Sequence, residues 1–264
     1  MSDGQTIDAF HFGRFHLVQP KGHGHRSGMD AMVLSAMVEA EGPVRVADLG
    51  AGAGAAGLSV AARIAGAEVV LVEKSPDMAA YARASLALAG NAWLADRVSL
   101  LEADVSLSGA ARIAAGLGDD MFDHVIMNPP FNDPADRQGQ DKLKAEAHLM
   151  HDGMFEAWIK TAGAILKPGG QLALIARPQS LPEVIAACGK RFGGLEITFL
   201  HPRAGAVAIR FLLSAIKGSR ARPVYRFPLV LHDTETHKFA AFVDDLNNGR
   251  ASYGRLQGGA GRQP

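Results

Sequence analysis

The 264-residue sequence has little of several features that would mark a specialised class of protein. Its single cysteine, Cys188, excludes an intrachain disulfide and favours a reducing compartment. The 27 basic residues (Lys and Arg) balance the 27 acidic ones (Asp and Glu), so no strong overall field indicates a nucleic-acid partner, although a local basic patch would suffice for one.

The sequence also has no pattern of a membrane anchor or a secretory signal. Residues 1–8 lack a basic start and an apolar stretch, and no apolar run is long enough to span a bilayer. The composition, 48% hydrophobic and 20% charged, is ordinary for a globular protein. We therefore expect a soluble cytoplasmic protein of one large domain with appendages.

From residue 44 onward, short apolar runs alternate with helical patterns. Strands are predicted at residues 44–49, 68–73, 98–102, 124–127 and 171–177, the last after a helix over 146–166 and a stop at 167–170. This alternation indicates βαβ units and a parallel sheet. Two later runs, 195–200 and 207–215, are joined by a link too short for a crossover helix, so they predict an antiparallel hairpin. The fold class is α/β.

The segments on either side of this core have different patterns. Aromatic residues alternate with polar ones between Phe10 and Phe15, which predicts a strand or hairpin, and a glycine-rich loop follows at 21–28. Asp30 is expected to cap the next helix. We expect an N-terminal extension over the active edge of the sheet (1–43), a core domain (44–218) and a C-terminal extension with a partly disordered tail (219–264).

The predicted strand 124–127 stops abruptly at Asn128-Pro129-Pro130-Phe131. The two prolines forbid helix and remove two backbone donors, so the nearby carbonyls point out at the carboxyl end of the strand. Ligands of open α/β sheets bind at this end. Asn128 Oδ1 and the Pro129 carbonyl could accept N–H bonds from a flat amine on which Phe131 stacks. Elsewhere the same four residues would be only a turn.

A glycine turn, Gly50-Ala-Gly52-Ala-Gly54, follows the first core strand. With Gly57 it satisfies the Gly-x-Gly-x-x-Gly pattern that holds a dinucleotide pyrophosphate, and Glu73 lies at a suitable distance beyond. The same turn could instead let the backbone pass close to S-adenosylmethionine, with Asp48 ordering the methionine end. The position of Asp48 fits this second pattern better.

Two further acids end the next strands of the core. Glu73 could accept the ribose hydroxyls of either cofactor, and Asp104 could accept from an adenine amino group. Each carboxylate could equally cap a helix or face solvent. Their positions at successive strand ends around one glycine turn favour a shared ligand.

Together these residues resemble the class I S-adenosylmethionine-dependent methyltransferases over Val44–Gly218. The resemblance implies a Rossmann-like, doubly wound, mostly parallel sheet of seven strands that ends in an antiparallel hairpin. The Asn-Pro-Pro-Phe motif looks like that of the amino-methylating branch, which acts on adenine N6, guanine N2 or a glutamine amide. The flanking residues Phe12 to Asp30 and His201 to Gly218 are similar to the bacterial tRNA(Val) adenine-N6 methyltransferase family.

The resemblance implies a set of site residues and partners. The catalytic residues would be Asn128, Pro129 and Phe131; the substrate-binding residues Asn128, Pro130 and Phe131; and the cofactor-binding residues Asp48, Gly50, Gly52, Gly54, Glu73, Asp104 and Asn128. The cofactor is S-adenosyl-L-methionine, the substrate is RNA, a tRNA in the first place, and no metal, membrane or obligate protein partner is implied. The polar segment 133–141 could close over the substrate.

Other hypotheses stay open at this point. Release factor glutamine methyltransferases share the Asn-Pro-Pro element, although they usually carry a larger helical domain before the core than the roughly 43 residues found here. DNA adenine and guanine N2 are further candidate targets of a methyltransferase. An NAD-dependent oxidoreductase and a non-catalytic binding module are the hypotheses from other functional classes. Smaller candidates are a metal site at His23 and His25 or His232–His237, a core role for Cys188, and a basic strip for RNA phosphates formed by Arg203, Arg210, Lys217, Arg220 and Arg222.

Overall fold

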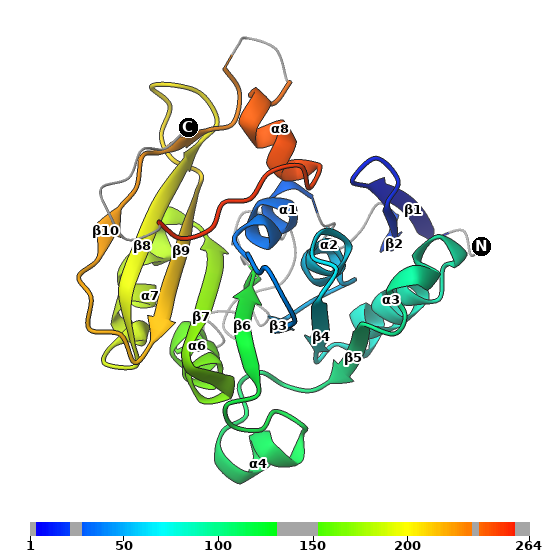
Figure 1. Cartoon of the computed structure of the whole chain (residues 1–264), viewed down its shortest axis with the longest axis horizontal. Helices are drawn as coiled ribbons and strands as arrows, with labels where there is room; N and C mark the ends of the chain where they lie inside the picture. Colours follow the sequence, from blue (N-terminus) through cyan, green and yellow to red (C-terminus); the bar gives the residue numbers. More distant parts are fainter. Residues whose placement is uncertain (1–3, 22–27, 131–152, 234–237, 257–264) are drawn as a thin grey trace, which may run out of the picture.

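The computed structural model describes residues 4–21, 28–130, 153–233 and 238–256. These residues form a central sheet with helices on both of its faces (Figure 1). Phe131, the polar segment 133–141, His23, His25 and His237 lie outside the described residues.

The sheet consists, among the described residues, of seven long strands and two strands of two residues each. The long strands are parallel except β9, which runs antiparallel to both β7 and β8. In order across the sheet they are β8 (Phe192–His201), β9 (Arg210–Lys217), β7 (Leu166–Ala176), β6 (Phe122–Met127), β3 (Val44–Leu49), β4 (Ala67–Glu73) and β5 (Val98–Glu102). The predicted mostly parallel α/β sheet with a terminal antiparallel hairpin is confirmed.

The short strands β10 (Val224–Tyr225) and β11 (Leu229–Val230) both pair parallel with the outer edge of β8. They were not predicted. Two residues are too few to produce a periodic pattern, and their apolar residues are interrupted by arginine and proline. They extend the sheet from seven strands to nine.

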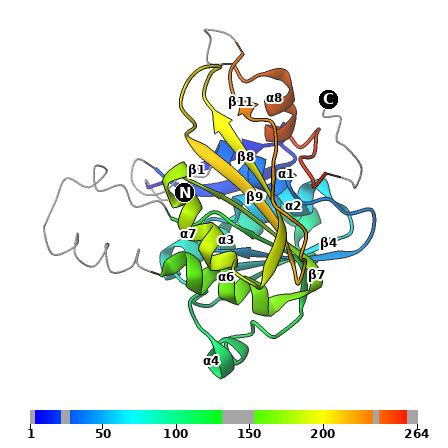
Figure 2. The ribbon, with the colours of Figure 1, turned by 90° about the vertical axis from the view of Figure 1, so that its left-hand side faces the viewer.

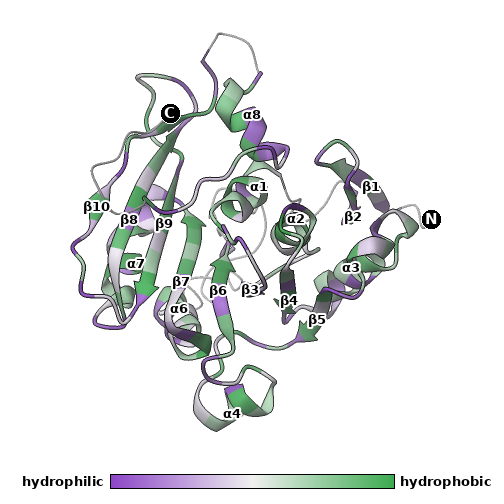
Figure 3. Ribbon diagram, in the orientation of Figure 1, coloured by the Kyte–Doolittle hydropathy of each residue, from purple (hydrophilic) through white to green (hydrophobic). Residues whose placement is uncertain are grey.

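Two hydrophobic clusters cover the faces of the sheet, which explains why its central strands are almost continuously apolar. On β6, for example, Ile126 belongs to one cluster, and Val125 and Met127 belong to the other. The first cluster includes residues of α1 (Met29–Ala36), α2 (Ala55–Arg63), α3 (Pro76–Leu86), η1 (Ala89–Leu94) and α8 (Ala241–Asn247). The second includes residues of α6 (Met154–Ile165) and α7 (Leu181–Cys188) (Figures 2 and 3). The described residues also form the helices α4 (Gly109–Ala114) and η3 (Pro178–Ser180).

Two local predictions were wrong. Residues 167–170, expected to stop a helix, belong to β7. The strand begins earlier than predicted because Leu166 already pairs with Phe122 of β6. The register between the two strands then shifts, and regular pairing resumes at His124 and Gln171. Asp30 does not cap α1: the cap residue is Gly28, without a side-chain hydrogen bond. The reason is a partner distant in sequence, since Asp30 Oδ2 accepts from Arg210 Nε at 2.7 Å.

The N-terminal segment forms an antiparallel hairpin of β1 (Gln5–Phe10) and β2 (Phe15–Pro20). Its second strand is held against α3 and η1 by two hydrogen bonds, from Val18 N to Ser85 Oγ at 2.9 Å and from His16 N to Asn91 Oδ1 at 2.8 Å. The hairpin therefore lies beside α3 rather than continuing the central sheet (Figure 1).

The tight contact of α2 against β4 generates a stability prediction. A Cβ at Gly57 would overlap Leu71 Cδ2 and lie 3.0 Å from Val69 Cγ1, both in the buried core. In Gly57→Ala, overpacking of about 1–3 kcal/mol should exceed the roughly 1 kcal/mol that alanine gains in helix propensity. We expect a net loss of up to about 2 kcal/mol in the free energy of unfolding, measured by urea denaturation.

The matched control is Gly42→Ala, because a Cβ at exposed Gly42 meets nothing within 4 Å. This variant should unfold with a free energy within about 0.5 kcal/mol of the unsubstituted chain. Equal stability of the two alanine variants would contradict the close packing of α2 on β4.

Candidate active site

The carboxyl ends of β3, β4 and β6 lie together at one edge of the sheet. Leu49 of β3 pairs with Val72 of β4 on one side and with Met127 of β6 on the other. The residues that follow, Gly50 and Asn128, therefore leave the sheet from adjacent strands, about 4.8 Å apart in an ideal sheet. The glycine turn and the Asn-Pro-Pro segment, far apart in sequence, begin side by side.

The glycine turn has a backbone that only glycine adopts without strain at its alternate positions. Gly50, Gly52 and Gly54 have φ angles of +72°, +57° and +92°. Gly50 N and Ala51 N both donate to Val72 O, at 2.8 and 3.0 Å. A Cβ at Gly50 would lie 2.5 Å from Cη2 of Trp158, which comes from α6 and supports the turn from below. The turn is thus a cradle of bare backbone, which suits the close approach of a nucleoside cofactor.

Glu73 connects the glycine turn to the end of β4. Its carboxylate is buried and accepts two backbone hydrogen bonds, from Gly52 N to Oε2 at 2.8 Å and from Ser75 N to Oε1 at 2.7 Å. Each carboxylate oxygen has a second lone pair, so Glu73 retains acceptor capacity for ligand hydroxyls. The structure places Glu73 directly against the turn, as a shared ligand site requires.

Asp48 lies beneath the turn with only 2% of its surface exposed. Its Oδ2 accepts from Gly57 N at 2.8 Å, in the first turn of α2. Burial, with a smaller contribution from the negative charge of Glu73, raises the pKa of Asp48 to about 7, although the hydrogen bond from Gly57 opposes this effect. The contact that the structure shows is with α2, and a contact of Asp48 with a ligand stays a prediction.

Asp104 follows β5 and is the more exposed of these acids, with 39% of its side chain accessible. Its Oδ1 accepts from both the backbone N–H and the hydroxyl of Ser106, and Lys74 Nζ lies 3.7 Å from Oδ2. Partial burial works to raise the pKa of Asp104, but the two hydrogen bonds from Ser106 and the charge of Lys74 outweigh it and hold the pKa below its usual value. Asp104 is therefore an ionised acceptor at neutral pH.

Asn128 is half-buried, and its Oδ1 is fully buried with no hydrogen-bond partner among the described residues. An unmade hydrogen bond of this kind costs about 1–3 kcal/mol, so a donor from a bound ligand would stabilise this oxygen. Pro129 is buried and Pro130 is exposed, and neither has an N–H to compete for acceptors. The role of Phe131 stays a prediction.

Several supporting residues were missed by sequence reasoning. Ser106 could have been found, because the Asp-x-Ser spacing of Asp104 and Ser106 is typical of a turn in which the aspartate accepts from the residue two positions on. Trp158 gave no signal, since it reaches the glycine turn from a helix more than 100 residues later.

The basic strip proposed for RNA phosphates is not continuous. Arg210 and Lys217 stand at the two ends of β9. Each is paired with a carboxylate, Arg210 with Asp30 and Lys217 with Asp120, both at 2.7 Å. Cys188 is buried in the core, as predicted, and burial raises the pKa of its thiol to about 12. Residues 4–21, 28–130, 153–233 and 238–256 contain no group of three His, Cys, Asp or Glu side chains that could hold a metal.

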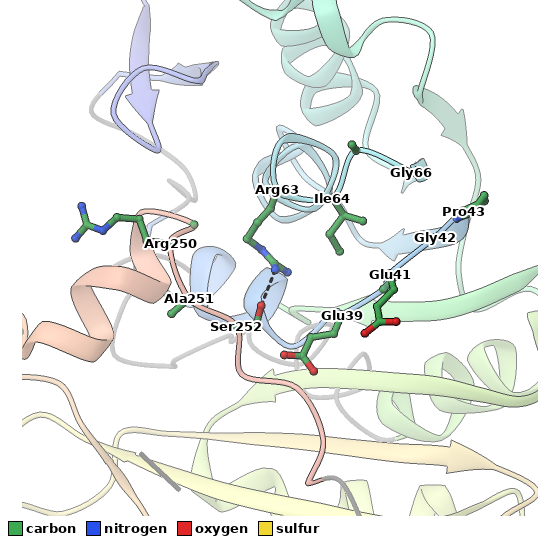
Figure 4. A pocket seen from close by; sticks show the side chains of 13 residues that line it. Glu39, Glu41, Gly42, Pro43, Arg63, Ile64, Gly66, Arg250, Ala251 and Ser252 are labelled. Atoms are coloured by element: carbon green, nitrogen blue, oxygen red, sulfur yellow. Dashed lines mark hydrogen bonds between the residues drawn. The ribbon is translucent and has the colours of Figure 1, made fainter.

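A cavity of about 970 Å³ lies at the opposite end of the sheet (Figure 4). It is lined by residues 39–43, which precede β3, by the last residue of α2 with the three that follow it (63–66), and by 249–252, which follow α8. Arg63 crosses it to donate to Ser252 Oγ at 3.0 Å. Because it lies at the amino ends of the strands, it is separate from the glycine turn and from Asn128. No described helix is both long and apolar enough to cross a membrane.

The raised pKa of Asp48 predicts a pH-dependent stability. Between the ~3.9 of an exposed aspartate and about 7, the folded chain retains a proton that the unfolded chain has lost, so stability falls as pH rises through this range. Asp48→Asn keeps an acceptor for Gly57 N but cannot titrate. Relative to the unsubstituted chain it should gain about 2–3 kcal/mol between pH 5 and pH 8, measured by urea denaturation at both values. An identical pH dependence in the two proteins would show that Asp48 is ionised in the fold.

Comparisons with known proteins identify the family. The family model of the methyltransferase small domain matches residues 28–198. A tRNA1(Val) (adenine(37)-N6)-methyltransferase of Shewanella sp. (strain W3-18-1) is 31% identical over 173 residues, which are 66% of this chain and 68% of the relative. A release factor glutamine methyltransferase of Deinococcus radiodurans is 32% identical over 149 residues, covering 54% of this chain and 49% of the relative.

Among solved structures, one described as a predicted O-methyltransferase from Agrobacterium tumefaciens has a TM-score of 0.76 and 55% sequence identity, covering 86% of this chain and 99% of that one. A 16S rRNA guanine N2 methyltransferase of Thermus thermophilus, in complex with S-adenosylmethionine and guanosine, shares the fold with a TM-score of 0.52 at 23% identity, over 81% of this chain and 50% of that one. The chain therefore belongs to the methyltransferase small domain family and is an S-adenosylmethionine-dependent methyltransferase.

Proposed function

We propose that this methyltransferase transfers its methyl group to an exocyclic amino nitrogen, and that the acceptor is adenine N6 in a tRNA. The observation that carries the proposal is the buried Oδ1 of Asn128, which has no hydrogen-bond partner among the described residues and stands beside the glycine turn at the carboxyl end of β6. An acceptor without a donor, next to the place for the cofactor, suits an amine as the incoming group.

The cofactor half of the site is formed by residues at the carboxyl ends of β3, β4 and β5. S-adenosylmethionine supplies an electrophilic methyl group on a sulfonium when it is bound. Gly50, Gly52 and Gly54 present bare backbone to it, and Glu73 offers free lone pairs to its ribose hydroxyls. Asp104, ionised at the end of β5, would accept from the cofactor's adenine amino group, and Asp48 fixes the start of α2.

The substrate half is the Asn-Pro-Pro segment. The amine would donate its two N–H groups to Asn128 Oδ1 and to the Pro129 carbonyl, which leaves the nitrogen lone pair free to attack. As the N–C bond forms, the S–C bond of the sulfonium would break, and one N–H proton would then leave to solvent. These oxygens also stabilise the positive charge that develops on nitrogen, an effect of preorganised dipoles. Pro130 would hold the plane of the base, with Phe131 in the same role as the sequence predicts, which contributes by orientation. A paired or stacked base must first be splayed out.

The neutrality of these acceptors favours nitrogen over oxygen as the methylated atom. A hydroxyl nucleophile must lose its proton during transfer, so its site needs a general base. Asn128 and the Pro129 carbonyl cannot take up a proton, but they can hold an amine whose lone pair attacks before a proton leaves. This argument separates the proposal from the O-methyltransferase description of the Agrobacterium structure.

A glutamine amide is the second candidate acceptor, because release factor glutamine methyltransferases also match this chain. Those matches cover about half of each relative (49% and 51%), whereas four of the five tRNA adenine-N6 relatives are covered over 68% of their length or more. We place the tRNA adenine first for this reason.

The first test is the Asn128→Ala variant. Loss of one oriented acceptor should lower kcat by about a hundredfold or more, by analogy with the loss of one oxyanion-hole donor. Binding of S-adenosylmethionine, measured by calorimetry, should survive. The control is Asn128→Asp, which keeps an acceptor of the same shape and should retain more activity than the alanine variant. Normal turnover by Asn128→Ala would refute the amine clamp.

The second test identifies the acceptor. Radiolabelled S-adenosylmethionine should transfer its methyl group to unmodified total tRNA, and digestion should release N6-methyladenosine. DNA, ribosomal RNA and a purified release factor serve as parallel acceptors. Label confined to the release factor would establish the glutamine reading, and label confined to DNA would show that the nucleic acid was assigned wrongly.

A further inference from the structure

We propose that Arg220, Arg222, Tyr225 and Phe227, on the outer edge of the sheet, form a contact surface for a single-stranded part of the RNA substrate. We call these four residues the arginine–aromatic edge. The inference rests on the proposed function. It adds to that function a surface that binds the RNA at a distance from the target base.

The two aromatic rings of this edge are held in an outward position. β10 pairs Tyr225 with Ile197 of β8, and Arg226 N donates to Ile197 O at 2.8 Å. Between the rings, the Arg226 side chain turns inward: it is 9% exposed, lies 3.9 Å over the Tyr253 ring and donates to Gly254 O at 2.7 Å. Since neighbouring residues of an extended chain point to opposite sides, Tyr225 and Phe227 are directed to solvent.

These rings are unusually accessible for large aromatics on an anchored segment. Tyr225 is 65% exposed and Phe227 is 77% exposed. A single exposed hydrophobic side chain needs no explanation, but two rings two residues apart on a fixed backbone form a ready stacking platform. Aromatic rings of this kind stack on bases of any sequence.

The charge of the same segment complements a phosphate backbone. Residues 218–228 contain three arginines and no Asp or Glu. Arg226 Nη1 forms an ion pair with Glu196 Oε2 at 3.5 Å. Arg220 and Arg222 are exposed and form no ion pair within the part of the chain that the structure describes. The chain as a whole has zero net charge, so this segment carries a local excess of positive charge. Such an excess favours the phosphate backbone of RNA as the partner.

The distance between the arginine–aromatic edge and the strand that carries Asn128 suits a polynucleotide. Four steps across the sheet separate β6 from β10, through β7, β9 and β8 (Figure 1). At ~4.8 Å a step this is about 19 Å, or roughly six nucleotides of a stacked strand at ~3.4 Å each. The same segment continues to β11, which pairs with β8 as far as His201 at the carboxyl end of that strand. Asn128 lies at the same edge of the sheet.

A second copy of the chain is the competing occupant, because β10 is an open sheet edge. Its geometry disfavours strand pairing between copies. β10 has two residues, and Pro223 and Pro228 on either side of it lack the N–H groups that a ladder needs. An RNA strand that contacts rings and guanidinium groups makes no demand on these backbone groups.

The test compares the affinity of the full chain for unmodified tRNA in three paired variants. Tyr225→Leu with Phe227→Leu removes the rings but keeps apolar bulk, and should raise the dissociation constant at least about fivefold. Tyr225→Phe with Phe227→Tyr keeps both rings, and should bind within about twofold of the unsubstituted chain. Arg220→Gln with Arg222→Gln should reduce the slope of log K against log salt by about 1.4.

Lys160→Gln is the charge control, because Lys160 is exposed on α6 away from this edge, and it should change neither the affinity nor the slope. Calorimetry with S-adenosylmethionine and thermal melting report whether each variant is folded. If a leucine variant is unfolded, the exposed arginine pair decides the question through the salt slope.

The outcomes separate the two proposals. If the unsubstituted chain methylates tRNA and all paired variants bind it equally well, the arginine–aromatic edge is refuted and the proposed function stands. If the unsubstituted chain neither binds nor methylates RNA, both are refuted. If sizing shows a dimer that the leucine variant converts to a monomer while its tRNA affinity is unchanged, the edge serves a second copy of the chain instead.

Discussion

The two hydrogen bonds that Glu73 accepts from the backbone are the contact on which the site depends. One, from Gly52, fixes the glycine turn, and the other, from Ser75, fixes the residue that caps α3. Asp48 makes the corresponding contact on the other side of the turn, where it accepts from Gly57 at the start of α2. A turn with three positive φ angles has no side chains of its own to hold it, so these carboxylates supply its rigidity.

This arrangement gives the acids two tasks that do not conflict. A carboxylate has about four acceptor sites, and Glu73 uses two of them for the backbone. The alternatives weighed for these residues, structural support and ligand binding, are therefore not exclusive. The structural task is visible in the contacts, and the binding task is the one that we propose from the lone pairs that remain.

The parts of the fold that sequence predicted are those encoded locally. The apolar runs of β3, β4 and β6 and the glycine turn are continuous segments, and they were placed within a few residues. The errors have long-range causes. Asp30 was assigned to a cap because a helix follows it, but Arg210, 180 residues later, provides a charged partner. Residues 167–170 carry a turn sequence, yet the neighbouring strand β6 draws them into the sheet.

The same distinction applies to the site. The position of Asp48, Glu73 and Asn128 at one edge of the sheet could be predicted, because each lies at or next to the end of a predicted strand. Trp158 could not be found, since its approach to Gly50 depends on how α6 packs. Nor could the basic residues be sorted from sequence: five were grouped by proximity in the chain, but a strand separates Arg210 from Lys217, and both are neutralised by carboxylates.

The distribution of charge around Asn128 gives a physical reason for an amide at this position. Beneath the glycine turn, burial, with a smaller contribution from the negative charge of Glu73, already raises the pKa of Asp48. A carboxyl group at this position would change its acceptor capacity with pH as it titrates. An amide oxygen accepts at every pH, because it does not titrate. Under the proposed function, an acceptor that does not titrate, beside a turn held by buried acids, would keep its hydrogen-bonding capacity over the pH range in which Asp48 changes its charge.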